Sequence, residues 1–294
     1  MMELKPVLCF GEIVWDALPA GIFLGGAPLN VAYHLNRLGR PALPVSRVGK
    51  DFLGEETLRR LEAKEVSTKL IQRDADLPTG AVVVELDPSG DARYTICEPA
   101  AWDAIGMTDG LSRMAGNAVA VVYGSLALRK EDANPATLSA LLEAAPVRLC
   151  DVNLRAPHDD RERVLDWAGK ATHIKLNEEE LERLSPVPVA EGLERALEAL
   201  AETTGVGHLI LTRGGDGAHV WKEGRVLSAA VPEVEVADTV GAGDAFTAAY
   251  LDAFLRGESA EACLDRAVKL GAFVAGRSGA QPDYGDGPPE GVSG

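Results

Sequence analysis

The chain has 294 residues, 46% of them hydrophobic and 25% charged, a composition typical of a globular protein and unlike that of a disordered one. Its net charge of −16 argues against nucleic acid or an anionic membrane as the main partner. The four cysteines are widely spaced, and no apolar run approaches the ~20 residues of a membrane span. We therefore expect a cytoplasmic protein with reduced thiols, no zinc site and no signal peptide.

Short apolar runs alternate with helical patterns along most of the chain. Such alternation predicts an α/β fold with a mainly parallel sheet and helices on both faces, in one domain over residues 1–294. Residues 229–236 also look like a strand, and the Gly/Pro-rich residues 283–294 are expected to fray. The predicted strands are 7–10, 118–123, 147–150, 173–176 and 208–212, and the predicted helices are 29–38, 54–64, 135–144, 161–169 and 190–203.

Two segments, at about 12–26 and 79–104, break this alternation. Both look extended and antiparallel, and the second contains DPSGD at 87–91, which has the composition of a hairpin turn. With no helices between their strands, they predict a small separate sheet. Open α/β sheets bind ligands beyond the carboxyl ends of their strands, so this sheet is placed to close as a lid.

The stretch DTVGAGDAF at 238–246 opens an apolar helix and is the most informative in the chain. Small side chains at Gly241, Ala242 and Gly243 let three backbone N–H groups converge where a helix start favours negative charge. Asp244 would repel a phosphate bound there unless it accepts a proton from an attacking hydroxyl. The pattern therefore predicts phosphoryl transfer with Asp244 as the base, and the alternative is a simple helix cap.

DTVGAGDAF resembles the signature of the ribokinase-like, or phosphofructokinase-B type, carbohydrate kinases. The segment GGAPLN at 25–30 resembles the other signature of that family, and the resemblance covers nearly the whole chain. It implies a three-layer α/β/α fold, ATP and Mg²⁺ as cofactors, and transfer of the γ-phosphate to a sugar hydroxyl. The two other common ATP-binding designs are disfavoured, because the chain has neither G-x-x-x-x-G-K-[ST] nor a kinase-type glycine loop followed by V-A-I-K.

Two further elements match the family by position. The D-x-N-x-R element at 151–155 implies that Arg155 reaches the substrate or the transferring phosphate, and the alternative for Arg155 is a surface salt bridge. The N-x-x-E element implies that Asn177 and Glu180 serve the magnesium-bound phosphates. A lone carboxylate suffices there, because Mg²⁺ keeps most of its waters.

The resemblance also implies where the nucleotide binds. Thr212, Gly214 and Gly217 match its nucleotide loop, although the same glycines suit an ordinary turn between 208–212 and 218–222. Ala280, in the closing G-A element, is expected to line the adenine pocket or a potassium site near Asp238.

By the same resemblance, Asp16, Gly25, Gly26 and Asn30 form the sugar pocket. The alternatives are a turn for Asp16 and a helix-start polar residue for Asn30. Trp102 is expected either on a sugar face or in the core of the lid. A buried carboxylate and amide discriminate well between sugars, because a ligand without the matching hydroxyls leaves them unpaired.

GEIVWDALP at 11–19 and the lid segment look most like the fructokinase branch, which implies fructose as the acceptor. Ribose, 2-keto-3-deoxygluconate and nucleosides remain open, as does a non-catalytic sensor on the same fold. A Rossmann dehydrogenase is set aside, because no G-x-G-x-x-G follows the first strand. The resemblance further implies dimerisation through the lid.

Overall fold

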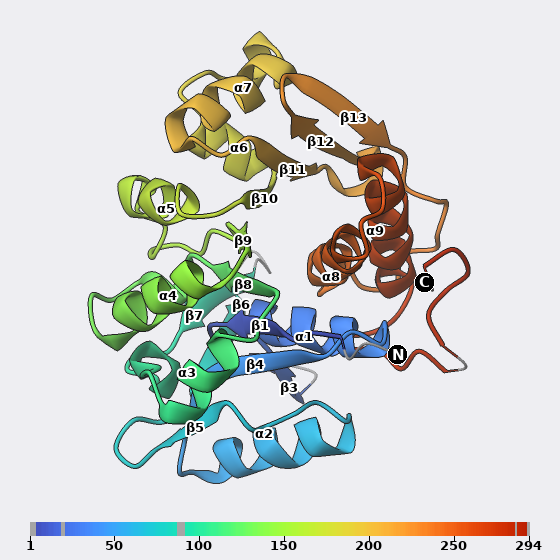
Figure 1. Cartoon of the computed structure of the whole chain (residues 1–294). Coiled ribbons are helices and arrows are strands. Elements are labelled where there is room, and N and C mark those ends of the chain that lie inside the picture. Colours follow the sequence, from blue (N-terminus) through green and yellow to red (C-terminus); the bar gives the residue numbers. More distant parts are fainter. Residues whose placement is uncertain (1–3, 19–20, 87–91, 286, 293–294) are drawn as a thin grey trace.

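The computed structural model describes residues 4–18, 21–86, 92–285 and 287–292. Its central sheet has the strand order β13-β12-β11-β10-β9-β8-β1-β4-β5 (Figure 1). Neighbouring strands pair in parallel from β5 to β11, whereas β12 and β13 form an antiparallel edge. The strands are β1 (Val7–Phe10), β4 (Ala42–Gly49), β5 (Ile71–Asp74), β8 (Ala120–Gly124), β9 (Val147–Asp151), β10 (His173–Asn177), β11 (His208–Thr212), β12 (Ala218–Lys222) and β13 (Arg225–Ala229).

Helices cover both faces of this sheet, which confirms the predicted α/β class. Along β1, Val7 and Cys9 join an apolar cluster with α1, α8 and α9, whereas Leu8 and Phe10 join a second cluster with α4, α6 and α7. Strands of a parallel sheet are apolar on both faces for this reason. The helices are α1 (Ala27–Arg37), α2 (Phe52–Ala63), α3 (Asp109–Ala115), α4 (Ala133–Ala144), α5 (Arg161–Ala168), α6 (Glu178–Leu184), α7 (Leu193–Thr204), α8 (Ala242–Leu255) and α9 (Ala260–Ala275).

A smaller sheet, with the order β3-β2-β6-β7, follows directly from β1 and so lies beyond the carboxyl ends of the main strands. Its strands β2 (Val14–Leu18), β3 (Gly21–Gly25), β6 (Gly80–Leu86) and β7 (Ala92–Ile96) come from the two segments predicted to be extended. The pairs β2–β3 and β6–β7 are antiparallel as predicted, but β2 and β6 run parallel. The DPSGD segment at 87–91 lies outside the described residues.

Two local predictions are wrong. No strand continues from β13 through residues 230–236, where Pro232 lacks an N–H to donate and the side chains of 232–236 are exposed. The C-terminal segment does not fray over its described part, because Tyr284 and Val292 are buried and the Val292 carbonyl accepts from Arg266 Nη2. Apolar anchors therefore outweigh the Gly/Pro composition there.

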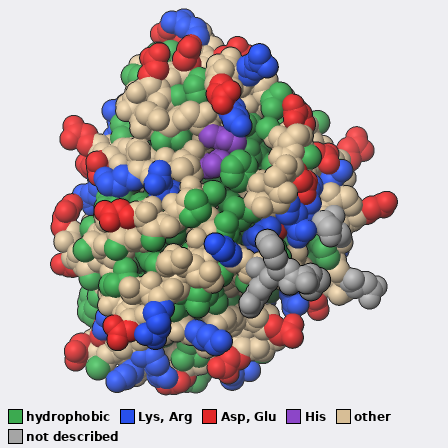
Figure 2. Space-filling model, viewed as in Figure 1, with side chains coloured by type: hydrophobic (Ala, Val, Ile, Leu, Met, Phe, Trp, Pro, Cys, Tyr) green, Lys and Arg blue, Asp and Glu red, His purple; other side chains and the backbone are tan. Residues whose placement is uncertain are grey.

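Acidic and basic side chains are interspersed over the face seen in Figure 2, with apolar side chains gathered between them. Among the described residues, we find no helix with the length and apolar character needed to cross a membrane.

Candidate active site

Most of the predicted site residues converge at the carboxyl edge of the main sheet. The parallel strands β1, β8, β9, β10 and β11 all end at this edge, and the N-terminus of α8 lies against it. A Cβ added at Gly243, in the first turn of α8, would lie 3.3 Å from Lys175 Nζ on β10. The helix start and the strand ends therefore share one site, as expected for an open α/β sheet.

The start of α8 requires glycine. Gly241 has φ 79°, in the left-handed region, and a Cβ there would lie 2.5 Å from Ala280 Cα. The Asp238 carboxylate ties the two adjoining loops together by accepting from the N–H groups of Val240 and Gly279, each at 3.0 Å. Asp238 thus shapes the loop in which the resemblance placed a cation.

The three N–H groups predicted to form an anion hole are not equivalent. The N–H of Ala242 donates to the Thr239 carbonyl at 3.2 Å. Those of Gly241 and Gly243 have no partner among the residues that the structure describes. Two free donors and the dipole of a 14-residue helix still favour an anion at this point.

Asp244 lies in the first turn of α8 and makes no capping hydrogen bond, since the N-cap is Gly241. Its Oδ2 accepts from Asn30 Nδ2 of α1 at 2.7 Å. Burial and the neighbouring carboxylates of Asp151 and Glu12 raise its pKa from 3.8 to about 7, against the lowering effects of Asn30 and Lys175. A carboxyl that titrates near neutrality is suited to accept a proton, which favours the general-base prediction over the helix cap.

A buried ion pair lies beneath this helix start, and the sequence analysis missed it. Lys175 Nζ is 3.0 and 3.2 Å from the two carboxylate oxygens of Asp151, and Thr247 Oγ1 of α8 donates to Asp151 Oδ2 at 3.0 Å. Burial lowers the pKa of Lys175, but the carboxylates of Asp151 and Glu180 outweigh it and the net shift is upward. The charged ammonium of Lys175 therefore lies next to the start of α8, where an anion is favoured. The available signal was a lysine within an otherwise apolar strand-like run, and the structure sets this lysine in register with Asp151.

Arg155, Asn177 and Glu180 line one small pocket of about 100 Å³, together with Leu154, Glu179 and Arg183. Glu180 accepts from the N–H groups of Leu154 and Asn177, each at 2.8 Å, and Asn177 Oδ1 accepts from the Glu180 N–H at 2.9 Å. Arg155 is exposed and forms no ion pair among the described residues, so the salt-bridge alternative is not observed. The structure brings the D-x-N-x-R and N-x-x-E elements together.

The predicted sugar residues also converge. A Cβ at Gly25 would lie 2.9 Å from Asp16 Oδ2, and one at Gly26, where φ is 119°, would strike the Glu12 carbonyl. The missing side chains of Gly25 and Gly26 therefore leave space beside the Asp16 carboxylate and the Glu12 main chain. Burial raises the pKa of Asp16, against the opposing charge of Arg155.

Glu12 is a second residue that the sequence analysis missed. It is buried, its Oε1 accepts from the Ala27 N–H at 3.2 Å, and its Oε2 has no partner among the described residues. Burial raises its pKa from 4.5 to about 7, and Arg155 lowers it. A carboxyl with one free buried oxygen at the end of β1 belongs to the candidate site.

Trp102 does not reach the site. It has 0% exposed surface and packs with Val14, Val82, Ala100 and Leu126 under the small sheet. A fully buried ring cannot lie on a sugar face, so the lid-core alternative holds for Trp102.

The loop after β11 has two kinds of glycine. Gly217, with φ 101°, is required by the turn, because a Cβ there would strike the Ala229 carbonyl. Gly214, with φ 55°, faces open space, and Thr212 is bonded to the Leu176 carbonyl at 3.4 Å. Gly214 and the neighbouring Gly215 are therefore the part of the predicted nucleotide loop that is free to approach a ligand. Ala280, predicted to line the adenine pocket or a potassium site, lies beside Gly241, and its carbonyl accepts from His34 Nε2 at 3.0 Å.

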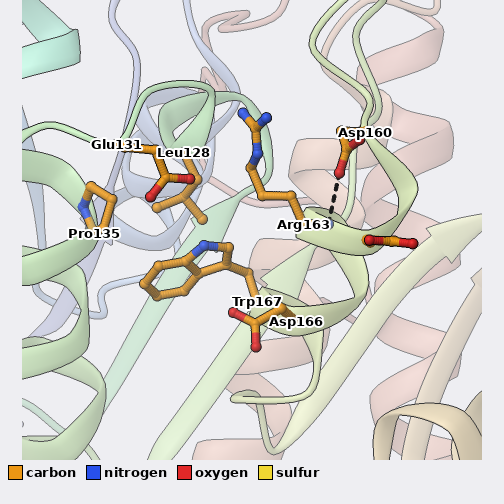
Figure 3. A pocket seen from close by; sticks show the side chains of 8 residues that line it. Leu128, Glu131, Pro135, Asp160, Arg163, Asp166 and Trp167 are labelled. Atoms are coloured by element: carbon orange, nitrogen blue, oxygen red, sulfur yellow. Dashed lines mark hydrogen bonds between the residues drawn. The ribbon is translucent and has the colours of Figure 1, made fainter.

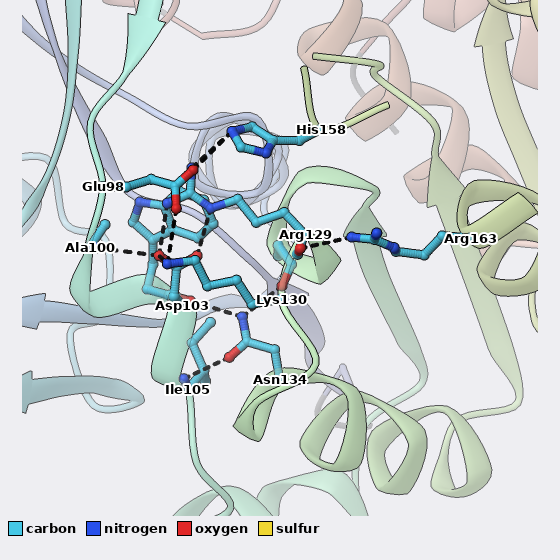
Figure 4. A network of polar contacts seen from close by, with 11 residues as sticks. Glu98, Ala100, Asp103, Ile105, Arg129, Lys130, Asn134, His158 and Arg163 are labelled. Atoms are coloured by element: carbon cyan, nitrogen blue, oxygen red, sulfur yellow. Dashed lines mark hydrogen bonds and ion pairs between the residues drawn. The ribbon is translucent and has the colours of Figure 1, made fainter. Parts of the chain in front are cut away.

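A polar network joins the small sheet to the main sheet beside the site (Figure 4). The Arg129 guanidinium, after β8, bonds both carboxylate oxygens of Asp103 at 2.8 and 2.7 Å and lies 4.0 Å over the Trp102 ring. Glu98, after β7, pairs with Lys130 at 3.0 Å and His158 at 3.3 Å. These contacts fix the loop that follows β7 against the main sheet.

A separate hollow lies away from these residues. Figure 3 shows it between α4 and α5, with Trp167 at its base and the acids Glu131, Asp160 and Asp166 around it. Its volume is about 470 Å³, and none of the predicted site residues lines it. A surface this acidic does not suit a nucleotide phosphate.

Comparison with known proteins identifies the family. A model of the "pfkB family carbohydrate kinase" matches residues 11–285. A fructokinase from Klebsiella pneumoniae is 31% identical over 255 residues, which covers 82% of this chain and 81% of that protein.

Solved structures share the fold. A fructokinase from Xylella fastidiosa with bound ATP superimposes with a TM-score of 0.80 at 23% identity, over 95% of this chain and 94% of that one. A double mutant of the fructokinase from Vibrio cholerae O395, bound to fructose, ADP and a potassium ion, gives 0.79 at 24% identity, over 96% and 97%. The match over residues 11–285 spans most of the sequence, and we conclude that the chain belongs to the pfkB family of carbohydrate kinases.

Proposed function

We propose that this carbohydrate kinase is a fructokinase, which transfers the γ-phosphate of ATP to a hydroxyl of fructose. The observation that carries the proposal is Asp244, a carboxyl with a pKa of about 7 that is bonded to Asn30 at the N-terminus of α8. Asp244 would accept the proton of the sugar hydroxyl as that oxygen attacks the phosphorus. The N–H groups of Gly241 and Gly243 would bind the charge that develops on the transferred phosphoryl group.

The remaining residues would position the two substrates. Asp16, Asn30 and the free Oε2 of Glu12 offer acceptors and a donor to sugar hydroxyls. Arg155, exposed at the pocket mouth and without an ion pair among the described residues, would clamp phosphate in its planar fork. Gly214 would admit the nucleotide close to the backbone.

Mg²⁺ fits the pocket of Arg155, Asn177 and Glu180 through water. Both oxygens of Glu180 already accept a backbone N–H, so this carboxylate is suited to hold a hydrated ion rather than a bare one. When bound, Mg²⁺ neutralises charge on the phosphates. A potassium ion beside the Asp238 loop is also part of the proposal, supported by the ion found in the Vibrio cholerae fructokinase.

Fructose is proposed because the relative from Klebsiella pneumoniae is named a fructokinase and covers most of this chain. The same site chemistry suits ribose or 2-keto-3-deoxygluconate, since acids and amides accept and donate to many hydroxyl patterns. A non-catalytic sensor is less well supported, because Asp244 and the glycines of the anion site are all in place.

The proposal extends to assembly and location. The outer face of the small sheet, defined here by the in-register residues Ala17, Ile22 and Val83, leaves Ile22 and Val83 49% and 39% exposed. This apolar surface would be covered by the same face of a second copy. The four cysteines are free thiols, which suits the reducing cytoplasm.

A coupled ADP-release assay tests the function. The purified chain is given ATP and Mg²⁺ with fructose, ribose, 2-keto-3-deoxygluconate, glucose or adenosine in turn. Selective turnover of fructose is expected. Selective turnover of another sugar would move the substrate assignment but keep the role of Asp244, and silence on all five, with a sugar still bound, would support a sensor.

A further inference from the structure

The side-chain amide of Asn30 is bonded at both ends. Its Nδ2 donates to Asp244 Oδ2 at 2.7 Å, and its Oδ1 accepts from Gln281 Nε2 at 2.8 Å. Gln281 lies in the segment after Ala280, 251 residues further along the chain than Asn30. None of the motifs that predict the active site includes Gln281.

An amide has a donor end and an acceptor end, whereas an ionised carboxylate only accepts. If Asn30 presents Nδ2 to Asp244, it stabilises the ionised base. If the amide is turned over, Oδ1 faces the carboxylate, and only protonated Asp244 can bond to it. The partner on the far side of Asn30 therefore influences which state of Asp244 is favoured.

We propose that Gln281 is a positioning residue for the base: by donating to Asn30 Oδ1, it holds the amide so that Nδ2 faces Asp244 and keeps this carboxylate ready to accept a proton. The proposal rests on the proposed role of Asp244. Gln281 itself acts only through Asn30.

The backbone around Gln281 is held independently of its side chain. Lys64 Nζ donates to the Gln281 carbonyl at 2.9 Å, and Tyr33 Oη donates to the Pro282 carbonyl at 2.7 Å. His34 Nε2 must be the donor to the Ala280 carbonyl at 3.0 Å, so its Nδ1 accepts from Tyr284 Oη at 2.7 Å. Because side chains of α1 and of Lys64, just after α2, bond to the main chain here, removal of the Gln281 amide should leave the segment in place.

The groups around Asp244 set the direction of the expected change. Asp151 on β9 and Glu12 after β1 raise the pKa of Asp244, after the larger effect of burial, whereas Asn30 on α1 and Lys175 on β10 lower it. Without the donation from Asn30, the pKa of Asp244 should rise above its present value of about 7. The acid limb of the kcat/KM profile should then move to higher pH.

Two substitutions and a matched control test the proposal. Gln281→Met keeps the length of the side chain and removes both hydrogen-bonding ends. Gln281→Glu only accepts, so it draws Asn30 Nδ2 toward itself and turns Oδ1 to Asp244. Lys64→Met removes a contact to the same residue through its main chain and leaves the amide pair intact.

The acid limb of kcat/KM is measured between pH 5.5 and 9 with ATP and the best sugar. It should move upward by about half a pH unit or more in Gln281→Met and by about one or more in Gln281→Glu, and it should stay in place in Lys64→Met. In an Asn30→Ala background, Gln281→Met should add no further shift. Unmoved limbs in both Gln281 variants, or an equal shift in Lys64→Met, would overturn the proposal.

A second measurement needs no turnover. The free energy of unfolding in urea is followed over the same pH range for the wild-type chain and Gln281→Glu, each with and without Asp244→Asn. The part of the pH dependence that Asp244→Asn abolishes is due to Asp244. Its midpoint should lie at higher pH in Gln281→Glu than in the wild-type chain, and an equal midpoint would overturn the proposal. If no sugar is phosphorylated but this shift occurs, the proposed function fails while the role of Gln281 stands.

Discussion

Asp244 illustrates at the residue scale how a site can cost stability. Burial and two nearby carboxylates raise its pKa from 3.8 to about 7, so the folded protein holds this proton more tightly than the unfolded chain does. The stabilisation is complete below pH 3.8 and is lost as the pH rises through about 7. The ionised carboxylate of Asp244, the proposed base, is therefore destabilising above about pH 7.

The substitution Asp244→Asn should separate activity from stability. Turnover is expected to fall by roughly 100-fold or more, the usual effect of losing a general base. At pH 8 the variant should be more stable than the wild type, by at most about 4 kcal/mol, because the charge is removed and Oδ1 of the new amide can still accept from Asn30. Urea unfolding of both proteins at pH 8 and pH 5 measures the difference in unfolding free energy. A difference in favour of the variant that is larger at pH 5 than at pH 8 would contradict this explanation.

Glu12→Gln should shift the pH profile in the other direction. The Glu12 carboxylate raises the pKa of Asp244, so a neutral amide should move the acid limb of kcat/KM to lower pH, with the bond from the Ala27 N–H retained. The two acids both titrate at about 7 in the wild type, so the profile there belongs to the pair. If Glu12→Gln instead lowers turnover strongly and the remaining kcat/KM shows no acid limb, Glu12 would be identified as the base.

The residues that motifs reveal and those that they miss differ in one respect. Asp244, Asn30, Arg155 and Glu180 stand in short contiguous patterns that specify a turn, a strand end or a helix start. Lys175 is bonded to a partner 24 residues away, and nothing local to Lys175 shows that both charges are buried. Such tertiary pairing becomes visible only when the strand register is known.

At the scale of elements, β10 and β11 carry a pair of buried histidines. The rings of His173 and His208 lie 4.2 Å apart, and His208 Nε2 is bonded to Tyr250 Oη of α8 at 2.6 Å. Burial lowers the pKa of His173 to about 4 and that of His208 to about 3. The unfolded chain takes up these protons first, so stability is lost as the pH falls below about 6.5.

His173→Leu should relieve part of this loss. His173 Nε2 has no partner among the described residues, so an apolar side chain leaves no acceptor unpaired at that end. Relative to the wild type, the variant should gain ~2 kcal/mol of unfolding free energy between pH 7 and pH 4.5. Urea titrations at the two pH values test this, and a constant difference would show that folding does not change the pKa of His173.

The predicted elements agree with the structure where apolar periodicity is strong. The predicted helices correspond to α1, α2, α4, α5 and α7 within a few residues, and the strand 208–212 corresponds to β11. The strands β4 and β5 were missed, because Pro44, Ser46 and Arg47 interrupt the apolar run of β4 and β5 has only four residues, IQRD. The valines at 231, 234 and 236 imitate a strand, but no strand in the described part of the chain pairs with them.

At the scale of the whole molecule, the alternation of strands and helices was enough to predict a layered fold, and the order of the strands was not. β1 lies between β8 and β4, so segments far apart in sequence become neighbours through crossovers. The pattern of apolar residues reports which faces are buried, but central strands such as β1 and β8 are buried on both faces and so look alike. Pairing partners were therefore beyond prediction from one sequence.

The outer face of the small sheet provides a test of assembly. Ile22→Lys should convert a dimer into a monomer, because a buried ammonium without a partner is costly. Phe23 is the matched control: it is 45% exposed but in register with Asp16, so it lies on the opposite face of the sheet. Phe23→Lys should leave the dimer intact. Sedimentation or size-exclusion chromatography with light scattering measures both variants, and a wild-type monomer at all concentrations would refute the assembly.

The long separation between the residues that meet at the base has a consequence for synthesis. Asn30 is 214 residues from Asp244 and 251 residues from Gln281. At roughly 5–20 residues per second, the ribosome needs on the order of 10 to 50 s to make the chain between Asn30 and Gln281. During that time a nascent chain has neither Asp244 nor Gln281 to place beside Asn30. With Asp244 as the proposed base, a half-made chain would lack the group that accepts the proton, and activity would begin only near the end of translation.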